Sequence, residues 1–175
     1  QQFSSIQKTY SGIRIGSLVT AAALLNNSFI EKNFSVLHQA ANSLASAQIR
    51  QVATVGGNLC TASPSGDIAC ALVALKSKCE ILSSGGKLKT ISITDFFTGP
   101  RKTVLKKEEI LRCVLIPFNE KATTAFSGFI KIGTRRSMEC SVVSLAYHIQ
   151  TRKNETISEA GVAIGAVAPT IRFAY

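Results

Sequence analysis

The sequence predicts an α+β fold in which short helices in the first half of the chain are followed by strands in the second half. Two observations carry this prediction. Apolar residues recur with helical spacing in segments between residues 18 and 77, and strand-like apolar segments separated by glycine or polar turns dominate from residue 79 onward. The 175 residues, 46% of them hydrophobic, suffice for one core or for two small lobes that share an interface.

Two helices are expected in the first quarter of the chain. A short strand-like segment, Gly12–Ile15, leads to Ser17, a suitable helix cap, and to an apolar run that ends at Asn26. The second helix has one apolar stripe with steps of four and three. Its members are Ile30, Phe34, Leu37, Ala41 and Leu44.

A glycine-rich stretch, residues 49–67, follows these helices and holds Gly56-Gly57, Asn58 and Asp67. Glycine permits positive φ and a close approach of the backbone, which a loop cradling a phosphate or a sugar needs. Asp67 stands where the N-cap of a third helix is expected, and that helix extends to about Ser77. These residues alone fit two interpretations equally well, namely a tight turn before a capped helix and a ligand site.

Strands are expected in the remainder of the chain. The segments Cys79–Ser83 and Lys87–Ser92 form a hairpin around a glycine turn, and Thr94 or Asp95 is expected to cap a short turn that holds Phe96-Phe97. Further strands are expected at residues 110–116, 125–132, 142–150 and 159–167. The polar residues 121–124 mark a boundary between domains 1–120 and 121–175, and the second of these is expected to be truncated.

Several classes of function are disfavoured by the composition. The net charge of +10 is spread over short clusters without interleaved aromatic residues, so nucleic-acid binding is disfavoured, whereas an anionic cofactor or acidic partner subunits would use the same charge. No apolar run reaches the ~18 residues of a membrane span. Five cysteines without a C-x-x-C pair predict neither a disulfide framework nor a metal site, and they fit a reducing cytoplasm. Walker and Rossmann fingerprints and a nucleophile elbow are absent, and His38 and His148 are expected to be packing residues.

One family resemblance extends along nearly the whole chain. Residues 48–64, with Asp67 behind them, resemble the FAD-binding subunit or domain of the molybdenum hydroxylases, the xanthine dehydrogenase and carbon monoxide dehydrogenase family. The family pattern is I-R-N-V-A-T-x-G-G-N-x-x-x-A-S-P-x-x-D. Residues 49–67 of this chain depart from it mainly at Gln51. Five further motifs stand in the order of the family. They are I-R-I-G-S at 13–17, F-T-G-P-R-K at 97–102, E-I-L at 109–111, F-x-K-x-x-x-R at 129–135 and the counterpart of G-V-A-P-T at 166–170.

The resemblance implies a PCMH-type second lobe, with helices on an antiparallel sheet, followed by the start of a strand-rich C-terminal flavoprotein domain. The N-terminal lobe of the family, with its A-G-G-T-D-like loop, is expected to be missing before Tyr10. The resemblance also implies that the chain binds FAD noncovalently, as part of an oxidoreductase complex in the cytoplasm. Molybdopterin and iron–sulfur clusters would lie on partner subunits, and electrons would pass through FAD to NAD+ or another acceptor. The alternative is a non-catalytic interaction fragment that has lost FAD binding.

The resemblance further implies which residues hold the cofactor. Thr54 to Asn58 would contact the diphosphate and ribityl region through the backbone, and Asp67 would hold ribose hydroxyls. Leu111 would pack on the adenine or the ring system, and Lys131 would lie close to the isoalloxazine. No catalytic acid or base is expected, because the cofactor carries the chemistry. The full set of implied contacts is Leu44, Thr54, Val55, Gly56, Gly57, Asn58, Thr61, Asp67, Leu111 and Lys131.

Overall fold

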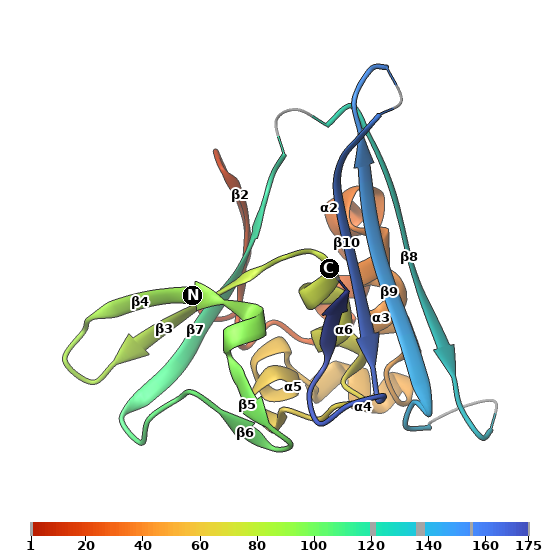
Figure 1. Ribbon diagram of the computed structural model, residues 1–175. Coiled ribbons are helices and arrows are strands. Elements are labelled where there is room, and N and C mark those ends of the chain that lie inside the picture. Colours follow the sequence, from red (N-terminus) through yellow and green to blue (C-terminus); the bar gives the residue numbers. More distant parts are fainter. Residues whose placement is uncertain (1, 120–121, 136–138, 155, 175) are drawn as a thin grey trace.

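The computed structural model describes residues 2–119, 122–135, 139–154 and 156–174, and it consists mainly of two antiparallel sheets with helices between them. Figure 1 shows the five-stranded sheet on the left and the four-stranded sheet on the right. Apolar side chains from the sheets and the helices join in one core. The α+β fold expected from the sequence is therefore confirmed.

The central strand of the five-stranded sheet is β7 (Glu109–Pro117), which pairs antiparallel with β2 and with β3. The strand order is β1-β2-β7-β3-β4. The other bounds are β1 Ile6–Thr9, β2 Gly12–Gly16, β3 Lys78–Ser83 and β4 Leu88–Ser92. The hairpin expected around the glycine turn is confirmed, and Gly86 turns it with a φ of 75°, which glycine adopts without strain.

A single turn of 3-10 helix, η1 (Ile93–Asp95), and a two-stranded ribbon connect β4 to β7. The ribbon consists of β5 (Phe97–Gly99) and β6 (Lys102–Thr103). The expectation that Thr94 or Asp95 caps a turn holding Phe96 and Phe97 is wrong, because the helical turn comes earlier and Phe97 already belongs to a strand. The reason is burial: Ile93 and Phe96 are both fully buried, so this turn forms where its two ends enter the core.

Helix α1 (Ala21–Leu25) begins later than expected. Its N-cap is Thr20, whose Oγ1 accepts a hydrogen bond from the N–H of Ala23 at 3.1 Å. The expected cap, Ser17, instead donates its N–H to the carbonyl oxygen of Arg112 at 3.1 Å, which holds it against β7. Local propensity allowed either residue as a cap, and the contact with the sheet decides between them.

The expected second helix is two helices, α2 (Ser28–Asn33) and α3 (Ser35–Ser43), which meet at Phe34. Phe34 has φ −136° and ψ 55°, which is outside the helical region. Its ring is buried against the rings of Phe29 and Phe118, and this aromatic cluster fixes the break. Two more helices, α4 (Ala47–Val52) and α5 (Val55–Thr61), occupy the stretch that was expected to be a loop.

The four-stranded sheet has the order β11-β10-β9-β8 and packs its inner face on α3 and α6 (Asp67–Ala74). A Cβ on Gly161 would come within 1.9 Å of the carbonyl oxygen of Ala74, so glycine permits this close packing. Helix α6 ends before the expected Ser77, and Lys76 has a φ of 49°. The three expected strands are confirmed, whereas β11 was not expected. The bounds are β8 Thr124–Ile132, β9 Val143–Thr151, β10 Ile157–Gly165 and β11 Arg172–Ala174.

None of the helices in the described ranges has both the length and the apolar character that crossing a membrane requires.

Candidate cofactor site

The Gly56-Gly57 segment is the first turn of a helix and not a loop. Helix α5 begins after Thr54, whose Oγ1 accepts a hydrogen bond from the N–H of Gly57 at 2.9 Å. Among the described glycines only Gly86 has a positive φ. The expectation of a loop with unusual backbone conformation is therefore wrong, and the two glycines have another role here.

The role of each glycine follows from its surroundings. Gly56 is buried, it donates its N–H to the carbonyl oxygen of Ser17 at 2.7 Å, and a Cβ on it would come within 2.7 Å of the Ser17 Cβ. Gly57 is exposed, and a Cβ on it would come no closer than 3.0 Å to a neighbour, the Thr54 Oγ1. Gly56 thus allows α5 to pack closely against the segment after β2. Gly57 has no side chain, and it therefore leaves space on the exposed side of α5.

The backbone N–H groups at the start of α5 are all used within the chain. Besides Gly56 and Gly57, Val55 donates to the carbonyl oxygen of Val19 and Asn58 donates to that of Thr54, each at 2.9 Å. The first turn of α5 therefore presents no unused amide to a phosphate. The polar groups that α5 and its N-cap present to the surface hollow beside them are the side chains of Thr54, Asn58 and Thr61.

Asn58 connects α5 to α6. Its Oδ1 accepts a hydrogen bond from the N–H of Ala69 at 3.1 Å, in the first turn of α6. The N-cap of α6 is Gly66, and Asp67 is the first helical residue, so the expectation that Asp67 caps this helix is wrong. Asn58 supplies the capping oxygen from a neighbouring helix. Because Oδ1 is held in this way, the free end of the amide is Nδ2, which has no acceptor within the described ranges.

A hollow of about 350 Å³ opens beside α4 and α5. It is lined by Leu44, Ile49, Val52, Ala53, Thr54, Gly57, Asn58, Thr61 and Ser63. The structure thus brings five of the ten expected cofactor contacts together, namely Leu44, Thr54, Gly57, Asn58 and Thr61. Ile49 and Val52 were not expected, although both are apolar and are 48% and 72% exposed, which is a recognisable signal of a binding surface.

Three other expected contacts do not line this hollow. Val55 is buried in the core, and Gly56 is buried against Ser17. Leu111 lies in β7 and is 4% exposed, also within the core. Their contact with a cofactor remains a prediction.

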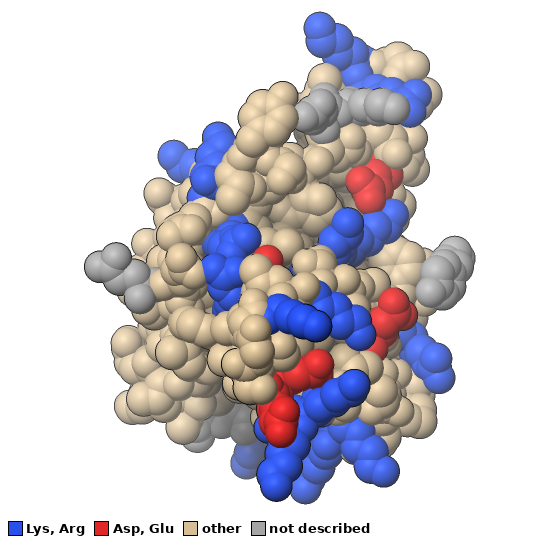
Figure 2. Space-filling view, turned by 90° about the vertical axis from the view of Figure 1, so that its left-hand side faces the viewer, with Lys and Arg blue, Asp and Glu red and all other residues tan. Residues whose placement is uncertain are grey.

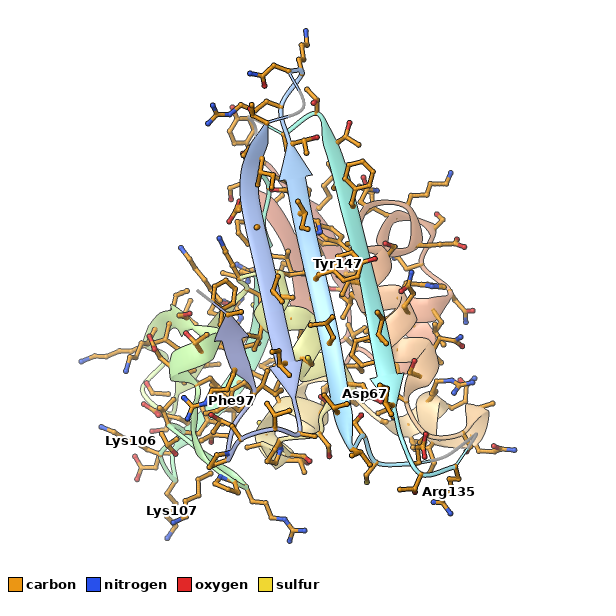
Figure 3. All side chains as sticks on the ribbon, turned by 45° about the vertical axis from the view of Figure 1, so that its right-hand side comes forward. Asp67, Phe97, Lys106, Lys107, Arg135 and Tyr147 are labelled. Carbon is orange, nitrogen blue, oxygen red and sulfur yellow. The ribbon has the colours of Figure 1, made fainter. Side chains whose placement is uncertain are left out.

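The last two expected contacts, Asp67 and Lys131, form an ion pair. Lys131 Nζ lies 2.7 Å from Asp67 Oδ2, and the side chains are 13% and 2% exposed. Ser141 Oγ donates to Asp67 Oδ1 at 3.1 Å, and Lys131 also donates to the carbonyl oxygen of Ser43 at 3.4 Å. Burial raises the pKa of Asp67, and the bonds from Lys131 and Ser141 oppose this shift. Figure 3 shows Asp67 near the end of β8.

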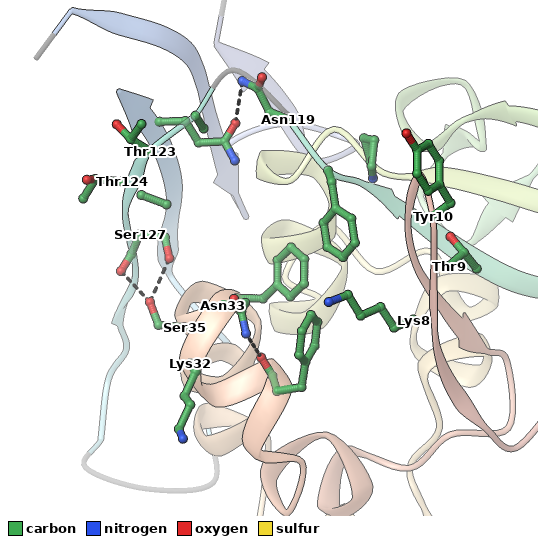
Figure 4. Close-up of a pocket in the computed structure, with 17 residues that line it drawn as sticks. Lys8, Thr9, Tyr10, Lys32, Asn33, Ser35, Asn119, Thr123, Thr124 and Ser127 are labelled. Carbon is green, nitrogen blue, oxygen red and sulfur yellow. Dashed lines mark hydrogen bonds between the residues drawn. The ribbon is translucent and has the colours of Figure 1, made fainter. Parts of the chain in front are cut away.

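A second, larger hollow of about 610 Å³ lies at the other end of β8 (Figure 4). The Phe29, Phe34 and Phe118 rings form part of its wall, and Lys8 Nζ lies 5.4 Å from the Phe29 ring centre. Several of its polar groups bond one another, as between Ser35 and Ser127 and between Asn119 and Gln150. None of the residues that line this hollow belongs to a family motif.

The charged surface and the cysteines can now be described. Lys and Arg outnumber acidic residues on the face in Figure 2, where uncharged residues separate them into groups. All five cysteines are free. No cluster of three or more His, Cys, Asp or Glu side chains that could hold a metal ion is found in the described ranges.

Solved structures show the same fold. The chain superimposes on a CO dehydrogenase chain from Oligotropha carboxidovorans with a TM-score of 0.89 at 20% identity, covering 98% of this chain and 58% of that one. A chain of quinoline 2-oxidoreductase from Pseudomonas putida 86 gives a TM-score of 0.85 at 23% identity, with the same coverage. The architecture is therefore that found in subunits of these two oxidoreductases.

Sequence comparison defines the family. Residues 1–119 match the family described as the FAD binding domain in molybdopterin dehydrogenase, and the chain belongs to this family. It is 36% identical over 158 residues to the xanthine dehydrogenase FAD-binding subunit of Escherichia coli O157:H7, a match that covers 90% of this chain and 53% of that subunit. The resemblance drawn from the motifs is confirmed. The chain spans about half the length of that relative.

Proposed function

We propose that this chain binds FAD noncovalently and is part of the electron-transfer subunit of a molybdenum hydroxylase similar to xanthine dehydrogenase. FAD held by this chain would supply electron transfer between iron–sulfur clusters and NAD+ or another acceptor. The iron–sulfur clusters and the molybdopterin would lie on partner subunits, and the complex would lie in the cytoplasm. The observation that carries the proposal is the hollow, where five residues implied by the family motifs meet.

The chemistry of the hollow suits a flavin nucleotide. Apolar side chains of Leu44, Ile49 and Val52 offer a surface for a flat ring, and Asn58 Nδ2 offers a hydrogen-bond donor without an intrachain acceptor in the described ranges. Mostly apolar walls with a few placed polar groups are typical of cofactor sites. Thr54 and Thr61 add hydroxyl groups, which bond Gly57 and remain at the rim.

The side chains would have binding and electrostatic roles. Lys131 would stabilise negative charge on the reduced cofactor, and the net charge of +10 favours an anionic ligand. No residue of the hollow is assigned as a proton donor or acceptor. Substrate hydroxylation would take place at the molybdenum centre of another subunit.

The test is a titration of the purified chain with FAD, followed by flavin absorbance and fluorescence. The Ile49→Glu variant places a carboxylate in the hollow, whereas Ile157→Glu places the same group on β10, at a site that is 63% exposed. Loss of the apolar contact with the ring, together with the cost of desolvating the carboxylate, predicts at least about tenfold weaker binding for Ile49→Glu. Ile157→Glu should bind FAD as the wild type does.

The competing hypothesis is an interaction fragment of such a complex that has lost FAD binding. The absence of an unused amide in the first turn of α5 favours it. No flavin signal in the purified chain, or in the chain assembled with its partner subunits and supplied with FAD, would establish this alternative. Equal affinities of the two glutamate variants would refute the assignment of the hollow.

A further inference from the structure

The larger hollow, at the start of β8, is separate from the candidate cofactor site. Its lining residues come from both sheets and from α2, and they include Lys8 and Thr9 of β1 and Thr124 and Ser127 of β8. No residue lines both hollows. A volume of about 610 Å³ is typical of sites for small molecules. The hollow is therefore large enough for an organic ligand of its own.

One wall of this hollow is aromatic. Phe34 and Phe118 stack with ring planes 9° apart and ring centres 6.4 Å apart, and Phe29 meets Phe118 edge-on at 6.3 Å. Phe29 and Phe118 are only partly buried, and both line the hollow. Rings in these arrangements offer a surface on which another flat, apolar group can pack.

The charge of the hollow is positive. Lys8 and Lys32 are the charged residues of its lining, and neither forms an ion pair with a carboxylate in the described ranges. In Figure 4 the Lys8 side chain extends toward the aromatic wall, and its Nζ lies 5.4 Å and 5.9 Å from the ring centres of Phe29 and Phe118. An anion bound by Lys8 would therefore lie directly beside a surface suited to a ring.

Several neutral polar groups of the hollow already have partners within the protein. Thr9 Oγ1 donates to the carbonyl oxygen of Gly12 at 3.0 Å, and the hydroxyl oxygens of Ser35 and Ser127 lie 2.7 Å apart in a hydrogen bond. Each of the two lysines, by contrast, has three N–H donors, and no acceptor for them is found within the part of the chain that the structure describes. The hollow therefore selects a ligand by negative charge more than by neutral hydrogen bonds.

We propose that this hollow is a second binding site, which takes a small aromatic carboxylate. The carboxylate contacts Lys8, the ring packs on Phe29 and Phe118, and Lys32 adds positive charge from α2. The proposal does not depend on FAD, because the two hollows have no residue in common. It adds a ligand to the proposed function and does not alter the cofactor site.

A titration of the purified chain with anthranilate, followed by the fluorescence of this compound, tests the ligand chemistry. Anthranilamide has the same ring without the negative charge, and acetate, measured by displacement of anthranilate, has the carboxylate without the ring. Anthranilate should bind at millimolar or lower concentration, and each of the other two at least about fivefold more weakly, because each lacks one of the two contacts. Absence of anthranilate binding, or equal affinities for anthranilate and anthranilamide, would overturn the proposal.

Lys8→Met removes the charge that is expected to hold the carboxylate. Lys107→Met is the matched control, because Lys107 is also exposed and does not line the hollow. Both variants lower the net charge by one, so general attraction of anions falls equally in the two. Lys8→Met should weaken anthranilate binding by about fivefold and Lys107→Met by less than about twofold. Equal losses would show that the attraction is not local, and the proposal would fail.

A blocking variant tests where anthranilate binds. Ala125 is exposed on the edge strand β8 and lines the hollow, so the indole of Ala125→Trp would occupy part of the space. With an unchanged urea midpoint, this variant should bind anthranilate at least about tenfold more weakly. Wild-type affinity in Ala125→Trp would overturn the assignment of the hollow.

The cofactor site supplies the last control. Ile49→Glu, in the other hollow, should bind anthranilate as the wild type does, and FAD should not displace anthranilate. A loss of anthranilate binding in Ile49→Glu, or its displacement by FAD, would place the compound in the cofactor hollow and refute a second site. If the wild type binds anthranilate but no FAD, the proposed function fails and the second site stands.

Discussion

Adding one methyl group to Gly56 or to Gly57 should have opposite consequences, although the two residues are adjacent in α5. A Cβ on Gly56 would come within 2.7 Å of the Ser17 Cβ and 2.8 Å of the Ser17 carbonyl oxygen. Backbone movement cannot relieve this contact without lengthening the 2.7 Å hydrogen bond from the Gly56 N–H to the same oxygen. Overpacking of this kind costs about 1–3 kcal/mol, and the weakened hydrogen bond costs about 1 kcal/mol more.

Alanine also has a higher helix propensity than glycine, by about 1 kcal/mol, and this gain offsets part of the cost. The net expectation for Gly56→Ala is a loss of about 2 kcal/mol in the free energy of unfolding. For Gly57→Ala the same gain applies, and the only close neighbour is the Thr54 Oγ1 at 3.0 Å. Its free energy of unfolding should therefore stay within about 1 kcal/mol of the wild type.

Urea unfolding followed by circular dichroism measures both values, and a loss of 2 kcal/mol lowers the midpoint by about 1 M. FAD titration adds a second comparison, because the new methyl group of Gly57→Ala lies in the hollow. This variant should be stable but bind FAD more weakly. The reasoning is refuted if Gly56→Ala unfolds at the wild-type midpoint, or if Gly57→Ala loses as much stability as Gly56→Ala.

Three further predictions concern buried polar groups. Asn58→Ala should lower the free energy of unfolding by about 1 kcal/mol through loss of the α6 cap, whereas Asn58→Asp keeps an acceptor and should lose less; both should bind FAD more weakly in titrations. Glu80→Gln should cost about 3 kcal/mol in urea unfolding, since it leaves two arginines without their carboxylate, and a wild-type midpoint would contradict this. Burial lowers the pKa of His148, so the unfolded chain takes up this proton at a higher pH than the folded chain. The free energy of unfolding should fall as the pH drops below about 6.5, the ordinary pKa of histidine, and His148→Gln should show a flatter pH profile between pH 5 and 8.

The longer strands could be predicted from the sequence because each is marked by its own residues, whereas β1, β5, β6 and β11 were not expected. The hairpin of β3 and β4 has a glycine turn, and β8, β9 and β10 are apolar segments between polar joints. The short strand β11 has no such pattern, since its three residues are paired only through their contact with β10. Sequence patterns thus reveal strands long enough to have a buried face.

The helices were harder to place because tertiary contacts determine where they begin and end. α3 is separated from α2 by the packing of Phe34, and α1 begins after its N-cap Thr20 because Ser17 is held by β7. α5 has seven residues, two of them glycine, and too little helix propensity to be recognised. It is held by Thr54 at its start and by contact with Ser17, and neither interaction leaves a periodic signal.

At the site, the sequence motifs reveal which residues matter, but only the tertiary contacts reveal what each residue does. The motifs identified Asn58 and Asp67 as important, yet the roles expected from local sequence fell on the wrong residue: the cap comes from Asn58, and Asp67 pairs with Lys131. The latter two residues are 64 positions apart, so local sequence cannot show their contact. Lys131 and Ser141 lie beyond the boundary expected at residue 121, whereas Asp67 and the hollow lie before it. The ion pair therefore joins a helix before that boundary to the second sheet, and the apolar core also includes residues on both sides of it, such as Leu72 and Ala146.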